Sequence, residues 1–134
     1  MSGIRMTLLA AAALLLSACG AMEKVKDKVS GLLQPGPAEQ RLSSGVKSYE
    51  EGDYKSSTEA LQGSLDMGLR SKGDQVTAYK YLAFIHCVSG REKQCRDEFK
   101  KAFEIDPNFD LKPAEAGHPV WGPVFRSVKP KPAK

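Results

Sequence analysis

Three cysteines, Cys19, Cys87 and Cys95, are the residues best suited to chemistry in this 134-residue chain. Cys19 lies three positions after the end of an apolar run near the N-terminus. Seven residues separate Cys87 from Cys95, and His86 immediately precedes the first of that pair. Thiolates serve as nucleophiles, metal ligands and disulfide partners, so the surroundings of each cysteine must decide among these chemistries.

The first 18 residues have the layout of a secretion signal. Arg5 supplies a short positive region, and the 11-residue run Met6–Leu16 is apolar apart from one threonine. This run is too short to span the ~30 Å hydrocarbon core of a bilayer and has the length of a signal peptide's apolar region. We therefore expect residues 1–18 to be removed after export, into a compartment where disulfides form.

The end of this signal resembles a bacterial lipobox. Leu16-Ser17-Ala18 precedes Cys19, and in bacterial lipoproteins a cysteine at this place carries a thioether-linked diacylglycerol, often with a further acyl group. Each buried CH₂ contributes ~0.8 kcal/mol, so such chains anchor a protein firmly. Gly20 stands where an Asp would favour inner-membrane retention, which implies a lipid-anchored protein on the periplasmic face of the outer membrane. An ordinary signal peptide with an incidental cysteine is the alternative.

With Cys19 assigned to lipid, Cys87 and Cys95 form an even pair in an exported protein, which predicts a disulfide. They lie across the Gly90 turn, where a helical hairpin brings Cα atoms within the ~4.4–6.8 Å that a disulfide needs. Two alternatives stay open. A redox pair usually has two intervening residues, and a zinc site with His86 needs a fourth ligand in a chain with two histidines.

The spacing of apolar residues predicts an all-α domain over residues 38–128. Apolar side chains recur three and four residues apart, and no segment alternates with period two long enough to predict a strand. Glycines and prolines mark the helix ends. The expected helices cover residues 38–51, 54–69, 75–89 and 91–106. Residues 19–37 are expected to be a lipidated tether, with a short amphipathic helix over 22–33 that either lies on the membrane or packs on the domain.

These four helices form two hairpins that resemble tetratricopeptide repeats. The turn glycines Gly52 and Gly90 are 38 residues apart, about one 34-residue period plus a four-residue loop. The second unit carries the fuller pattern: Tyr79, Leu82, Ala83, Gly90, Phe99 and the closing Ala102-Phe103-Glu104-Ile105-Asp106-Pro107-Asn108. The first unit has Gly45, Tyr49 and Glu51-Gly52-Asp53-Tyr54. It departs at Ser57 and Ser64, where the family usually has Ala, and it lacks the closing proline.

A C-terminal helix is predicted after Pro119, a residue suited to a first helical turn. Its apolar residues are Val120, Trp121, Val124, Phe125 and Val128. Two stacked units bury little apolar surface, so we expect Trp121 and Phe125 to cap the second hairpin; an exposed partner anchor is the alternative. Residues 111–118 are predicted to be an ordered loop or one helical turn, and the Lys- and Pro-rich residues 129–134 a disordered tail.

The chain lacks the patterns of an enzyme. It contains no phosphate-binding glycine loop, HExxH motif or nucleophile elbow. Its 20 Lys and Arg and 16 Asp and Glu are mixed along the chain without a basic stripe. We therefore expect no catalysis, no cofactor besides the lipid, no small-molecule substrate and no nucleic-acid binding.

The two resemblances imply a membrane-anchored scaffolding module that binds a protein partner of the cell envelope. Tetratricopeptide proteins bind peptides along the first helices of their units. Carried over by position, the contact residues are Val46, Tyr49, Glu50, Lys80 and Phe84, with packing between units as the alternative for Val46 and Phe84. Similar small lipoproteins accompany envelope machines, among which a type VI secretion accessory is favoured.

Two other classes of function stay open. One is a thiol–disulfide redox protein that uses Cys87 and Cys95, with His86 beside them. The other is a structural spacer whose lysine-rich segments touch membrane or peptidoglycan.

Overall fold

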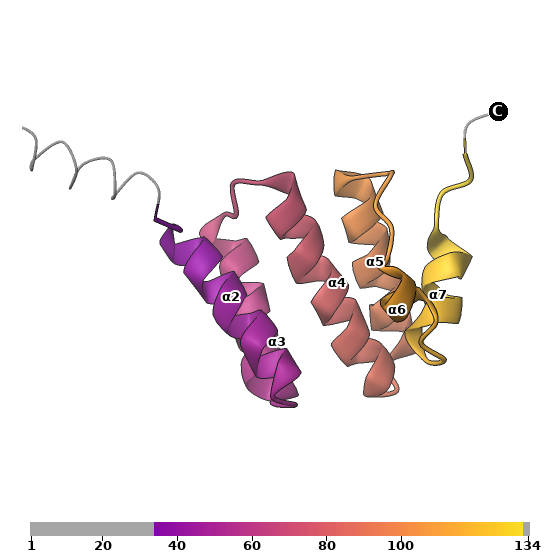
Figure 1. Ribbon diagram of the computed structural model, residues 1–134, viewed down its shortest axis with the longest axis horizontal. Coiled ribbons are helices and arrows are strands. Elements are labelled where there is room, and N and C mark those ends of the chain that lie inside the picture. Colours follow the sequence, from indigo (N-terminus) through magenta and orange to yellow (C-terminus); the bar gives the residue numbers. More distant parts are fainter. Residues whose placement is uncertain (1–33, 133–134) are drawn as a thin grey trace, which may run out of the picture. The chain divides into compact units, whose positions relative to one another are not determined.

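Six helices account for most of residues 34–132, the part of the chain that the computed structural model describes (Figure 1). They are α2 (Pro37–Glu50), α3 (Tyr54–Met67), α4 (Lys72–Val88), α5 (Glu92–Ile105), α6 (Pro113–Ala116) and α7 (Trp121–Val128). The expected signal, Cys19, Gly20 and the tether helix lie outside the described residues. None of the helices in residues 34–132 is long and apolar enough to cross a membrane.

The helices pair as two antiparallel hairpins, α2 with α3 and α4 with α5, which lie side by side (Figure 1). The prediction of an all-α domain of helix pairs is confirmed, and so is a short C-terminal helix. Two predicted boundaries were wrong for local reasons. Helix α4 begins earlier because the Ser71 hydroxyl caps it, accepting a hydrogen bond from the Asp74 N–H at 3.0 Å. Helix α3 ends at Met67 because Gly68 adopts a left-handed φ of 88°.

The first hairpin closes around small and hydroxyl-bearing residues. A Cβ on Gly45 would lie 2.9 Å from Leu61 Cδ2 and 3.1 Å from the Leu61 nitrogen, so only glycine permits this approach of α2 to α3. Ser57 and Ser64 are fully buried. Their hydroxyls donate to the carbonyls of Gly45 and Leu61, each at 2.7 Å. Serine is tolerated at these positions because both hydroxyls are hydrogen-bonded.

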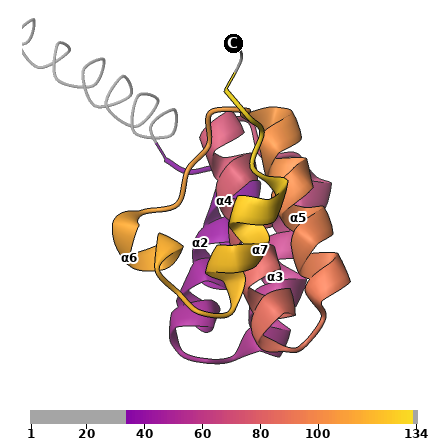
Figure 2. The ribbon, with the colours of Figure 1, turned by 90° about the vertical axis from the view of Figure 1, so that its right-hand side faces the viewer.

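The second hairpin and the C-terminal segment share an aromatic core. Helix α7 packs on α4 and α5, and α6 lies on the connecting segment beside them (Figure 2). Trp121 and Phe125 are 7% and 2% exposed, so the capping prediction is confirmed and the exposed-anchor alternative is wrong. The Trp121 ring stacks on Phe84 with centroids 4.2 Å apart, and Phe125 meets Phe99 edge to face at 5.2 Å.

Residues 111–118 contain α6, in agreement with the expected single turn. Leu111 is buried at the start of this segment. After α7, residues 129–132 have no regular secondary structure, and the Lys129 ammonium pairs with the Asp110 carboxylate. Residues 133 and 134 lie outside the described part of the chain.

Candidate functional site

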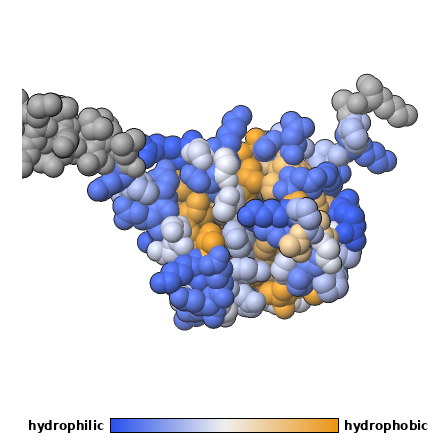
Figure 3. Space-filling model, viewed as in Figure 1, coloured by the Kyte–Doolittle hydropathy of each residue, from blue (hydrophilic) through white to orange (hydrophobic). Residues whose placement is uncertain are grey.

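A surface groove runs between α2 and the N-terminal half of α4, the first helices of the two hairpins. Helix α2 contributes six lining residues and α4 contributes two: Glu39, Leu42, Ser43, Val46, Lys47, Glu50, Asp74 and Thr77. The α2 residues recur at intervals of three and four, so they share one helix face. In Figure 3 apolar atoms lie between the two helices, with hydrophilic side chains on either side.

Two of the five predicted contact residues line this groove. Val46 is half-buried and packs against the core of the first hairpin, whereas Glu50 is exposed. Both the partner-contact hypothesis and the packing alternative therefore have support at Val46. Leu42, a buried member of the same core, lies beside it in the groove lining.

Tyr49 lies half-buried where the two hairpins meet. Its ring is 4.9 Å from the Tyr81 ring and 6.2 Å from Phe84, centroid to centroid. Burial, followed by the neighbouring Tyr54 and Tyr81, raises the pKa of Tyr49 to about 12. The neutral phenol is therefore the stable form, and the ring serves mainly to join the hairpins.

The other two predicted contact residues, Phe84 and Lys80, are buried by the C-terminal segment. Their assignment to an open binding surface was therefore wrong. Phe84 is 2% exposed because Trp121 stacks on it, so its side chain belongs to the core. Lys80 is 9% exposed, and its ammonium lies 2.8 Å from Glu115 Oε1. The sequence could not show that α6 and α7 return to cover the middle of α4.

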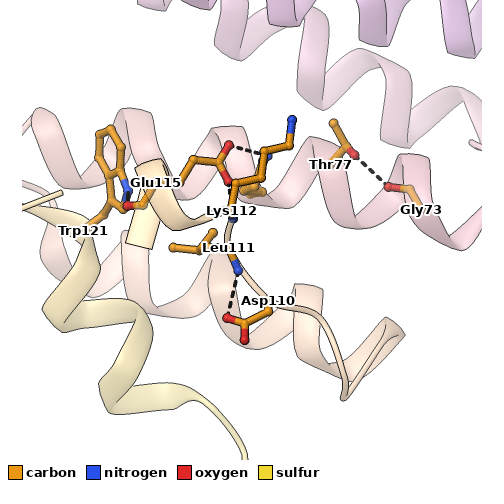
Figure 4. A network of polar contacts seen from close by, with 8 residues as sticks. Gly73, Thr77, Asp110, Leu111, Lys112, Glu115 and Trp121 are labelled. Carbon is orange, nitrogen blue, oxygen red and sulfur yellow. Dashed lines mark hydrogen bonds and ion pairs between the residues drawn. The ribbon is translucent and has the colours of Figure 1, made fainter. Parts of the chain in front are cut away.

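The Lys80–Glu115 pair belongs to a small network that ties α6 to the hairpin. Glu115 Oε2 accepts a hydrogen bond from the Lys112 N–H at 3.0 Å, and the Glu115 carbonyl accepts one from Trp121 Nε1 at 2.8 Å (Figure 4). Lys80 also lies 4.8 Å from the centroid of the Tyr81 ring. Because Glu115 compensates the charge of Lys80 within the fold, Lys80 is not available to form an ion pair with a partner.

Six of the eight lining residues were not among the predicted contact residues: Glu39, Leu42, Ser43, Lys47, Asp74 and Thr77. The apolar pattern predicts a helix that begins at Gln75 and so leaves Asp74 in a loop, whereas both Asp74 and Thr77 lie on α4 and face α2 across the groove. The capping serine at position 71 was the signal that would have placed them. Glu39 lies on the predicted first helix, but its position on the groove face depends on how the hairpins stack.

The second chemically interesting region is the turn between α4 and α5. Cys87 and Cys95 form a disulfide with Cα atoms 5.1 Å apart, as predicted. Cys95 is fully buried. His86 Nδ1 accepts a hydrogen bond from Arg91 Nε at 2.9 Å, and burial followed by the Arg91 charge lowers the pKa of His86.

A metal site was an open alternative for His86 and the cysteines. Within residues 34–132, no cluster of three or more His, Cys, Asp or Glu side chains has the arrangement to hold a metal ion. The other histidine, His118, stacks on Trp121 with the ring centroids 3.4 Å apart. In comparisons with known proteins, no family model, curated protein or solved structure matches this chain.

Proposed function

We propose that this protein is a lipid-anchored, tetratricopeptide-like module that binds a protein partner of the cell envelope through the groove between α2 and α4. The observation that carries the proposal is the groove itself, formed by the first helices of two stacked hairpins, with Leu42 and Val46 between charged side chains. In the family that the sequence resembles, this is the face that receives peptides.

The packing of the hairpins supports a tetratricopeptide-like unit. Small residues stand at both close approaches: Gly45, against which Leu61 packs, and the fully buried Ala83. Phe99 is fully buried at the place where the resemblance expects a large residue. The capping of the second hairpin by α7 offsets the small number of units, since stacked repeats need their terminal faces covered.

The buried disulfide favours a binding module over a redox protein. Cys95 is fully buried and Cys87 nearly so, whereas exchange requires a thiolate to reach one of the two sulfurs. We propose that the bridge is structural and that the protein is not an enzyme. In the redox alternative, folded protein would exchange quickly and reversibly with a mild thiol; slow exchange that tracks unfolding would support the structural bridge.

The groove is tested by crosslinking the full-length lipidated protein in envelopes and identifying its partners. Val46→Asp and Glu50→Lys are expected to abolish crosslinking to one defined partner, because they place charge on the apolar part of the groove and reverse charge at its rim. Glu104→Lys, on the exposed surface of α5, is the control and should leave the partner unchanged. Equal crosslinking by all variants would reject the groove as the binding face.

Anchoring is tested separately. We propose that Cys19 carries the lipid at the periplasmic face of the outer membrane, and that the partner belongs to an envelope machine, with type VI secretion favoured. Mass spectrometry of the mature N-terminus should find an acylated Cys19, and Cys19→Ala should remove the protein from the membrane fraction. A mature chain that begins elsewhere and bears no fatty acid would reject this part of the proposal.

A further inference from the structure

The groove between α2 and α4 is acidic, although the chain as a whole has a formal net charge of +4. Its lining contains three carboxylates and a single cation, Lys47. Local negative charge in a basic protein does not follow from composition, and it raises the local concentration of positively charged partners.

Two of the three carboxylates are not engaged within the described fold. Glu39 pairs with Arg70 at 3.4 Å, and hydrogen bonding to its own backbone and to Arg70 holds its pKa below the usual range. In contrast, neither the Glu50 nor the Asp74 carboxylate forms an ion pair or side-chain hydrogen bond with any residue in 34–132. Asp74 gains some stabilisation from the N-terminal end of α4 and remains able to pair with a cation.

The groove's one cation, Lys47, forms no ion pair with Glu50 or Asp74 in the described residues. Lys47 lies 3.8 Å from Glu51, one turn further along α2, and both side chains are largely exposed. Lys80, further along α4, is held by Glu115 beneath α6. Among the lining carboxylates, Glu50 and Asp74 are therefore the two without an ion-pair partner in residues 34–132, one on each wall.

The shape and lining of the groove suit basic side chains with apolar stems. Leu42 and Val46 offer apolar surface between the charged residues, along which the methylene groups of Lys or Arg can lie. The α2 wall extends from Glu39 to Glu50, about 16 Å at 1.5 Å per residue. An extended chain of about five residues covers that length.

We infer that this groove binds a short Lys- or Arg-bearing segment of a partner protein, in which basic residues alternate with apolar ones. The basic groups pair with Glu50, at the end of α2, and with Asp74, in the first turn of α4, and the apolar residues contact Leu42 and Val46. The inference rests on the proposed function of the groove as a binding face and specifies the chemistry of its partner.

The test uses residues 34–134, which contain the compact unit Pro35–Lys134 with its own core. Two labelled peptides serve as probes, one with the sequence Lys-Leu-Lys-Val-Lys and the other with Glu in place of each Lys. Fluorescence anisotropy should show tighter binding of the basic peptide, weakening as salt is added. Equal binding of both peptides, or no binding of the basic one, would overturn the inference.

Matched variants localise the effect. The double variant Glu50→Gln/Asp74→Asn should weaken binding of the basic peptide about three- to tenfold, the loss expected for two partly exposed ion pairs. The control Glu59→Gln/Glu104→Gln removes two exposed carboxylates from α3 and α5 and should leave affinity unchanged. Circular dichroism and thermal melting verify that each variant is folded. Equal weakening by the control pair would show nonspecific attraction and reject the groove.

Two outcomes separate this inference from the proposed function. If Val46→Asp abolishes crosslinking to a partner whose crosslinked segment has no Lys or Arg, the binding face stands and the inference about charge fails. If residues 20–134 no longer bind the basic peptide that residues 34–134 bind, the chain's own lysine-bearing segment 22–33 occupies the groove. That result would replace the partner with an intramolecular occupant.

Discussion

The two hairpins share one architecture but are stabilised by different means. The first hairpin closes with aliphatic side chains and two buried serines, with Gly45 allowing α2 and α3 to approach. The second has a disulfide, stacked aromatic rings and a capping helix. The hairpin that lacks the disulfide and the stacked rings supplies six of the eight groove-lining residues, so the candidate binding surface lies mainly outside the half that carries those features.

The first hairpin also depends on the second for part of its core. Its cluster of buried residues includes Ala78, Leu82 and Ile85, all of which belong to α4. Helix α4 is therefore used by both halves, which explains why apolar residues surround most of it. A helix contacted on two sides loses the simple amphipathic pattern of a surface helix.

The largest effect is expected from truncating the aromatic core. Phe99→Ala should lower the free energy of unfolding by about 3–5 kcal/mol, because a fully buried ring leaves a cavity between Phe84 and Phe125. Urea denaturation measures this loss. Leu61→Ala, the matched variant in the first hairpin, should cost about 2–4 kcal/mol.

Hydrogen exchange sharpens that contrast. In Leu61→Ala, amides of α2 and α3 should lose protection first while those of α5 keep theirs, since the second hairpin has its own core. In Phe99→Ala, protection should fall across both hairpins. Identical exchange patterns in the two variants would show that the domain unfolds only as a whole and that the hairpins do not differ in local stability.

Removing the disulfide should have the next largest effect. Cys87→Ser/Cys95→Ser is expected to lower stability by about 2–3 kcal/mol, from the entropy of the short loop that the bridge closes. The fold should persist at room temperature because the aromatic cluster remains. Thermal melts of this variant and of reduced wild-type protein should agree, and loss of helicity at room temperature would show that the bridge, rather than the rings, holds the second hairpin.

A pair of glycine substitutions tests the close approach in the first hairpin. Gly45→Ala should cost about 1–3 kcal/mol, because its Cβ would meet the side chain and backbone of Leu61. Gly63→Ala is the control. Its Cβ would meet only the exposed Arg41 side chain, which can move away, so the gain in helix propensity should make it neutral or slightly stabilising. Equal destabilisation by both would count against a special role for Gly45.

The smallest effect concerns alkaline pH. The pKa of Tyr49 is raised from 10.0 to about 12, so its contribution to stability is complete below pH 10 and is lost as the pH rises toward 12. Tyr49→Phe should remove the most alkaline step from the ultraviolet titration of the four tyrosines. It should also make stability fall less steeply between pH 10 and 12. An unchanged titration curve would show that another tyrosine accounts for that step.

Most of the fold could be predicted because its information is local. Apolar spacing, turn glycines and Pro119 indicated the helix pairs and the C-terminal helix, and the cysteines on either side of Gly90 indicated their disulfide. The errors arose where a single residue sets a boundary. Ser71 starts α4 a turn earlier than the apolar pattern does, and this hid Asp74 from the list of candidate residues.

A smaller part of the candidate site could be predicted, two of its eight lining residues. Val46 and Glu50 could be placed because they share a helix face with the expected binding surface. Phe84 and Lys80 were misplaced because residues more than 30 positions later, Trp121 and Glu115, return to cover them. No periodicity within α4 reveals which of its faces a later segment will bury.

The sequence by itself determined that residues 38–128 form an all-α domain of helix pairs and favoured a Cys87–Cys95 disulfide, since both depend on neighbours a few positions apart. Only the tertiary structure decided that α2 and α4 form an acidic groove, and that Phe84 and Lys80 lie beneath the C-terminal segment. Those properties arise when surfaces distant in the chain pack together, because burial and charge pairing depend on every segment that meets in space.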